Sequence, residues 1–159
     1  MYASIIDTPV GKLHIHANKV AVTYVGFFDD ARFPDTHNKQ IKPLAGNKIS
    51  QKAATQLIQY FAGQRKVFDL PLAPQGTDFQ KQIWQQLVEV KYGETASYLD
   101  LACAIKNPKA CRAVGAANGK NPISIVLPCH RIVGSNGKLT GYAGGLDRKS
   151  FLLSLEQSY

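Results

Sequence analysis

Residues 125–133 read Ile-Val-Leu-Pro-Cys-His-Arg-Ile-Val, and this stretch decides the interpretation of the chain. The apolar run at its start predicts a short buried strand over residues 125–127, with Cys129 and His130 just beyond its end. A cysteine beside a histidine is a candidate nucleophile, because the thiolate is the reactive form and a nearby base favours it. Adjacent residues on a strand point to opposite faces, so the two side chains can cooperate only through a local turn or a bridging water. The alternative is a small buried cysteine next to a hydrogen-bonded histidine.

The chain of 159 residues is basic, with a formal net charge of +8 and a pI near 9.5. Such a charge favours a polyanionic partner such as nucleic acid. The excess of lysine and arginine is shared between the two halves of the sequence, so charge does not locate the binding surface. A basic protein without a polyanionic partner is the alternative.

The sequence predicts neither a membrane protein nor a secreted one. No apolar stretch reaches the roughly 20 residues of a membrane-spanning helix, and the N-terminus lacks the pattern of a secretory signal. The three cysteines, Cys103, Cys111 and Cys129, fit neither a disulfide framework nor a four-ligand zinc site. The histidines of residues 1–75 have no ligand partners at a suitable spacing. We therefore expect a cytoplasmic protein with a reduced thiol and no metal.

The first half of the chain is rich in strand patterns. Alternating or β-branched apolar residues predict strands over Tyr2–Ile6, Lys12–Ala17 and Val20–Phe28. Residues 29–47 are polar and predict a loop, and the apolar stripe of Ser50–Ala62 predicts a helix. A small antiparallel sheet with one helix is the expected structure.

The segment Leu70–Gly76 contains two prolines and predicts a linker, because proline interrupts regular structure. We therefore expect an α+β protein with two domains. Residues 1–75 would form the strand-rich N-terminal domain, and residues 76–159 a mostly helical C-terminal domain.

The second half carries the pattern of a helix–turn–helix. Thr77 and Gln80 have the spacing of a capping box at the start of a first helix. Tyr98–Ile105 then predicts a short apolar helix, and a second helix is predicted over Pro108–Asn118 with Asn107 as its N-cap. Small residues dominate that second helix, so its backbone can approach a neighbouring surface closely.

These motifs together resemble the O6-alkylguanine-DNA alkyltransferases, which remove an alkyl group from damaged guanine and keep it. The matching segments are Tyr92–Thr95, Ser97–Tyr98, Asn107–Ala110, Arg112–Gly115, Asn121–Pro122, Val126–Val133 and Gly141–Leu146. The resemblance covers roughly residues 76–157, in the right order. It implies double-stranded DNA containing O6-alkylguanine as the partner, no cofactor and a monomeric protein.

The resemblance also implies a role for each catalytic residue. Cys129 would accept the alkyl group, and His130 would take the thiol proton through a water molecule. Glu156, which follows the apolar helix predicted over Leu146–Leu155, would hold the imidazole in the right tautomer. Asn121 would brace the turn around the nucleophile.

In the family, the arginine at the position of Arg112 enters the duplex as the damaged nucleotide rotates out. Tyr98 would crowd the phosphate of that nucleotide and donate to the guanine ring. Lys109 and Ala113 belong to the same DNA-binding motif.

The resemblance also implies a guanine pocket in this part of the chain. Tyr142 and Gly144 would form its wall. The backbone N–H of Ala143 would face the guanine oxygen, and the carbonyl of Ile132 would read the exocyclic amine.

Three positions depart from the family pattern. Ala143 stands where a serine is common, Ser124 where many members have proline, and Lys106 where many have glycine. These departures concern local rigidity and the breadth of the pocket, not the reaction.

Two other functions are weighed against this one. A non-catalytic alkylated-DNA-binding protein would flag the lesion for another pathway, but such relatives lack the nucleophile that Cys129 supplies. A Cys-His hydrolase of unrelated fold would need an oxyanion hole, and it would not explain the helix–turn–helix pattern or the basic charge.

Overall fold

The described part of the chain begins with a small antiparallel sheet. A computed structural model describes residues 1–29 and 45–159, and the loop expected over residues 29–47 lies largely outside that range. The strands follow one another in the order β1 (Tyr2–Thr8), β2 (Gly11–Ala17) and β3 (Val22–Phe27). The three strands expected from the apolar pattern are confirmed.

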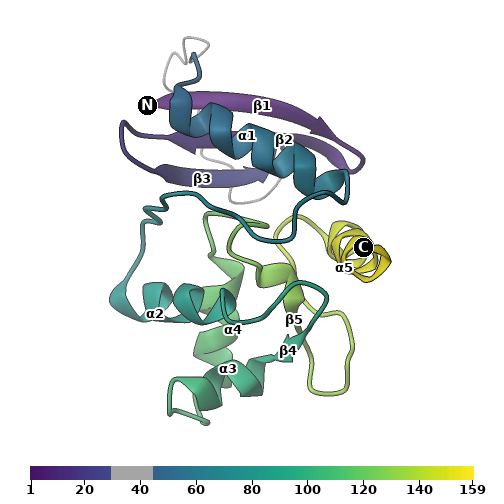
Figure 1. The fold of residues 1–159 in the computed structure, drawn as a ribbon. Helices are drawn as coiled ribbons and strands as arrows, with labels where there is room; N and C mark the ends of the chain where they lie inside the picture. Colours follow the sequence, from purple (N-terminus) through teal and green to yellow (C-terminus); the bar gives the residue numbers. More distant parts are fainter. Residues whose placement is uncertain (30–44) are drawn as a thin grey trace.

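Helix α1 (Lys48–Phe61) lies across one face of this sheet (Figure 1). Asn47 and Ser50 form a capping box that starts the helix. The covered face is apolar because Ile6, Leu13 and Phe27 occupy paired positions on the three strands. All three side chains are buried beneath the helix in one continuous core.

The outer edge of β3 joins the first half of the chain to the second. Val22 pairs in parallel with Leu72, so the proline-containing segment expected to be a linker runs along the strand. Val25 pairs in the same way with Ile123, which lies a few residues before Cys129. Backbone hydrogen bonds of 2.8–2.9 Å form both contacts. The apolar core is continuous across the junction, and the domain boundary after residue 75 stays a prediction.

The second half is mostly helical, which confirms the expected α+β class. Its elements are α2 (Asp78–Leu87), β4 (Ala96–Ser97), α3 (Tyr98–Ala104), α4 (Cys111–Gly119), the 3₁₀ helix η1 (Cys129–Arg131), β5 (Ile132–Val133) and α5 (Leu146–Ser158). The capping box of Thr77 and Gln80 is confirmed. Strands β4 and β5 pair in parallel, and α5 extends three residues beyond the expected end. Among the described helices, none has the length and apolar character that crossing a bilayer requires.

Helix α4 begins later than the sequence predicts. It starts at Cys111 with Ala110 as its N-cap, so the prediction that Asn107 caps a helix beginning at Pro108 is wrong. The physical reason lies at the end of α3, where Lys106 adopts a left-handed conformation with φ 60°. The N–H groups of Lys106 and Asn107 donate to the carbonyls of Cys103 and Ala102 at 2.9 Å each. This is a Schellman motif, in which Asn107 belongs to the C-terminal cap of α3 and does not begin the next helix.

Lys106→Gly should stabilise the protein, because glycine adopts a left-handed conformation without the steric cost that lysine bears there. We expect the free energy of unfolding in urea to rise by about 0.5–1 kcal/mol. Lys109→Gly is the matched control: Lys109 lies in the next turn without a positive φ, so this change should lower stability. Equal effects of the two substitutions would contradict the account.

Candidate active site

Residues 121–127 form a tight turn, not the strand predicted over residues 125–127. Ile125 is buried with φ 73°, and the Leu127 N–H donates to the Ile123 carbonyl at 3.0 Å. The side chain of Asn121 causes this reversal. Its Nδ2 donates to the Leu127 carbonyl at 2.7 Å, and its Oδ1 accepts from the Ile123 N–H at 3.0 Å. Asn121 therefore joins both sides of the turn that precedes Cys129, and its role in bracing the turn around the nucleophile stays a prediction.

The 3₁₀ helix η1 presents three consecutive side chains after Pro128. Cys129, His130 and Arg131 are all buried. In a 3₁₀ helix three residues complete one turn, so the three side chains point in three directions. The side chains of Cys129 and His130 therefore do not point to opposite faces, as they would on a strand. Cys129 is in no disulfide.

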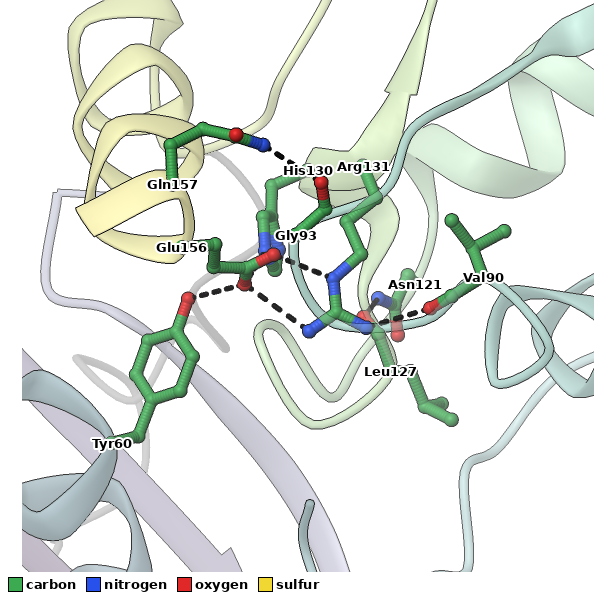
Figure 2. A network of polar contacts seen from close by, with 9 residues as sticks. All are labelled: Tyr60, Val90, Gly93, Asn121, Leu127, His130, Arg131, Glu156 and Gln157. Atoms are coloured by element: carbon green, nitrogen blue, oxygen red, sulfur yellow. Dashed lines mark hydrogen bonds and ion pairs between the residues drawn. The ribbon is translucent and has the colours of Figure 1, made fainter. Parts of the chain in front are cut away.

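Two residues of η1 contact the carboxylate of Glu156 (Figure 2). His130 Nε2 lies 2.6 Å from Glu156 Oε2. Arg131 donates from Nε to Oε1 at 2.7 Å and from Nη2 to Oε2 at 3.2 Å. Glu156 itself is buried on the inner face of α5.

Two groups from other elements complete this polar cluster. The Tyr60 hydroxyl, on α1, donates to Glu156 Oε2 at 2.6 Å. Arg131 Nη1 donates to the carbonyl of Val90, just after α2, at 2.7 Å. Figure 2 shows Tyr60 reaching the carboxylate from the side opposite to Arg131. The cluster thus gathers groups from α1, the end of α2, η1 and α5.

The protonation states follow from burial and these contacts. Burial alone would raise the pKa of Glu156, but the hydrogen bond from His130 and those from Arg131 and Tyr60 lower it from 4.5 to about 2. Burial lowers the pKa of His130, and Glu156 only partly offsets this. His130 is therefore neutral, with its Nε2–H donated to Glu156. Its Nδ1 is the basic nitrogen, and it has no hydrogen-bond partner within residues 1–29 and 45–159.

A surface cavity of about 580 Å³ is lined by residues of α3, of α4 and of the segment 140–143. Tyr98, Arg112, Tyr142 and Ala143 line it, so four of the expected DNA-binding and pocket residues meet at one place. Asn118 also lines it and donates from Nδ2 to the Cys129 carbonyl at 3.4 Å, which connects the cavity to the nucleophile. A second cavity, of about 410 Å³, lies between residues 72–75 and α2, and neither of the two cavities is lined by Cys129 or His130.

Two family models match consecutive parts of the chain. Residues 1–74 match the model described as the 6-O-methylguanine DNA methyltransferase ribonuclease-like domain, and residues 78–158 match the DNA binding domain of the same family. The chain belongs to the 6-O-methylguanine DNA methyltransferase family.

Similar proteins of this family come from archaea and bacteria. A methylated-DNA–protein-cysteine methyltransferase of Methanosarcina acetivorans is 46% identical over 158 residues, which cover 99% of each chain. The protein of that name from Mycobacterium tuberculosis is 44% identical over 153 residues, 96% of this chain and 90% of the relative. The crystal structure of Mycobacterium tuberculosis OGT in complex with DNA superposes with a TM-score of 0.88 at 40% identity. That superposition covers 99% of this chain and 94% of the other.

The remaining residues expected from the family resemblance have other surroundings. Lys109 and Ala113 are exposed before and within the first turn of α4. Ile132 is buried in β5, and Gly144 accepts a hydrogen bond from Arg148 Nη1 at 3.2 Å. Neither of these two lines the cavity. The described residues contain no group of three or more side chains placed to hold a metal ion.

Lys149 is a buried residue that the sequence reasoning missed. Its Nζ donates to the carbonyls of Ile132, Thr140 (2.7 Å) and Gly141 (3.4 Å). It thereby fastens the start of the loop that carries Tyr142. Burial lowers the pKa of the lysine, and the nearby Cys129 opposes that shift. A sequence signal existed, because Lys149 lies seven residues before Glu156 on the inward face of α5.

The low pKa of Glu156 predicts a change in acid stability. The ionised carboxylate stabilises the fold above pH 4.5, and this contribution is lost as the pH falls toward about 2. Glu156→Gln should therefore be less stable at neutral pH, and its free energy of unfolding should fall less steeply below pH 4.5. Urea unfolding at a series of pH values measures this. Glu94→Gln, at an exposed position, is the control and should retain the wild-type slope.

Proposed function

We propose that this protein repairs DNA by transferring the alkyl group of O6-alkylguanine to its own Cys129, irreversibly. Family membership supports the reaction, since the relatives that match the whole chain are methylated-DNA–protein-cysteine methyltransferases. The decisive observation is the buried Cys129-His130 turn with its imidazole fixed by Glu156. That arrangement provides a nucleophile, a base and an orienting carboxylate.

The transfer is a displacement at the alkyl carbon. Cys129 loses its thiol proton to His130 Nδ1, through a water molecule, and its sulfur attacks the carbon in line with O6. The carbon–oxygen bond breaks, its electron pair passes to guanine, and a thioether remains on the protein. The alkyl donor is the lesion itself, so no cofactor is required. None of the described groups can cleave the thioether, so each molecule acts once.

Neutral guanine must be regenerated as the bond breaks, and Tyr98 can supply the proton. The Thr140 hydroxyl donates to the Tyr98 hydroxyl at 3.0 Å, which leaves the hydroxyl hydrogen of Tyr98 available to donate to the guanine. Tyr98 lines the cavity together with Tyr142 and Ala143. We assign this cavity as the guanine pocket.

The target base must leave the DNA stack before it can enter this pocket, which costs a few kcal/mol. Arg112 is exposed in the first turn of α4 and also lines the cavity. It is therefore placed to fill the space of the extruded nucleotide, while Lys109 contacts phosphate. One copy of the chain contains all these groups, so a monomer suffices, and the reduced thiol suits the cytoplasm.

Cys129→Ser should abolish transfer while DNA binding persists, because a serine hydroxyl is a poor nucleophile of nearly the same shape. The assay incubates the protein with duplex DNA that carries a radiolabelled O6-methylguanine and counts label on the protein. Cys103→Ser, at an exposed cysteine of α3, is the control and should accept one label per molecule. Binding without transfer by the wild-type protein would instead support a non-catalytic alkylated-DNA-binding protein.

Arg112→Ala should slow transfer more on duplex than on single-stranded DNA, because a single strand requires less unstacking. We expect a loss on the order of tenfold on duplex and less than about threefold on a single strand. Arg112→Lys retains the charge and serves as the control for phosphate attraction. Equal slowing on both substrates would show that Arg112 contributes only charge.

A further inference from the structure

Tyr60 is a fully buried residue of α1, the helix of the first half of the chain, yet it touches the polar cluster of the second half. Its hydroxyl donates to Glu156 Oε2 at 2.6 Å, across 96 positions of sequence. Its ring is held by the rings of Phe61, Phe68 and Tyr92, at centroid distances of 5.3, 5.6 and 6.2 Å. The hydroxyl is therefore presented to the carboxylate by a rigid aromatic cluster.

The two oxygens of Glu156 have different partners. Oε1 receives Arg131 Nε, whereas Oε2 lies 2.6 Å from both His130 Nε2 and the Tyr60 hydroxyl. Arg131 Nη2 also donates to Oε2, at the longer distance of 3.2 Å. The short bond from Tyr60 fixes the oxygen that meets the imidazole (Figure 2).

We propose that Tyr60 is a positioning residue for alkyl transfer: its hydroxyl fixes the Glu156 carboxylate that orients His130 toward Cys129. The proposal rests on the function proposed above and extends it to the first half of the chain. That half thereby contributes to the reaction through Glu156, in addition to supporting the fold.

The groups around Glu156 determine how the Tyr60 hydroxyl acts on the carboxylate. Arg131 faces the carboxylate from η1, Lys149 acts on His130 from α5, and Tyr92 lies beyond Tyr60 after α2. The environment raises the pKa of Tyr60, so the phenol stays protonated and can only donate to the carboxylate. Without this donor, the carboxylate charge would bear more strongly on the imidazole. The pKa of His130 would rise, and its orientation would loosen.

The test compares Tyr60→Phe with Tyr92→Phe. Both changes remove one phenolic hydroxyl from the same aromatic cluster and keep the ring. The Tyr92 hydroxyl is buried without a hydrogen-bond partner in the described part of the chain, so it is a matched control. The single-turnover rate of methyl transfer from O6-methylguanine duplex should fall about tenfold in Tyr60→Phe, the size expected for one hydrogen bond to a charged group. It should stay within about twofold of wild type in Tyr92→Phe.

A double-mutant cycle shows whether Tyr60 acts through Glu156. In a Glu156→Gln background, Tyr60→Phe should change the rate by less than about twofold, because the oriented carboxylate is already lost. A histidine NMR titration should show a higher pKa for His130 in Tyr60→Phe than in wild type. Urea unfolding confirms that each variant is folded under the assay conditions.

The outcomes separate this proposal from the function on which it rests. Equal rates for Tyr60→Phe and wild type, with label on Cys129, would overturn the role of Tyr60 and leave the repair function standing. Tenfold slowing in both backgrounds would overturn it too, because Tyr60 would then act elsewhere. Absence of label from the wild-type protein would overturn the repair function, and the proposal with it.

Discussion

The rest of the site depends on the hydrogen bonds that compensate the buried carboxylate of Glu156. A buried charge is costly unless hydrogen bonds and an opposite charge compensate it. Here the compensation comes from Tyr60 of α1 and from His130 and Arg131 of η1, so that together with Glu156 of α5 three segments far apart in sequence meet. Removal of any one donor leaves a poorly solvated charge in the core, so the three segments are held in one arrangement. The position of the imidazole is thus a consequence of satisfying one anion.

The fold provides two independent supports for this arrangement. One is the edge of β3, where Val25 pairs with Ile123 and so fixes the start of the turn that precedes Cys129. The other is α5, whose inward face carries Lys149 and Glu156. Lys149 holds the start of the loop that carries Tyr142, and Glu156 holds His130, so one helix contacts both the proposed pocket and the proposed base. The edge of β3 contacts the chain before Cys129, at Ile123, and α5 contacts the chain after Cys129, through Lys149 and Glu156.

Local patterns predicted the elements well where one segment determines its own structure. The strands of the first half, the capping box at Thr77 and the C-terminal helix follow from periodicity and caps within a few residues. The failures have a non-local or stereochemical cause. Residues 125–127 look like a strand because they are apolar, but the amide of Asn121 bonds both sides of the segment and closes it into a turn. The lysine at position 106 does not itself indicate a left-handed conformation, and the glycine that many family members have there was not interpreted in that way, so the start of α4 was misplaced.

The same limit explains which site residues were found. Cys129 and His130 were candidates because they are adjacent, and Glu156 came from the family resemblance. Tyr60 acts through contacts that no local pattern encodes, and Lys149 was signalled only by its spacing to Glu156 on α5. Arg131 follows His130 directly in the sequence, and its position bears on the protonation state of His130. Arg131 forms an ion pair with Glu156, so a permanent positive charge helps to compensate the buried carboxylate. Burial then keeps the imidazole neutral, and a neutral imidazole is what can accept the thiol proton. In the proposed reaction, the arginine beside the histidine thus favours the neutral form that the base requires.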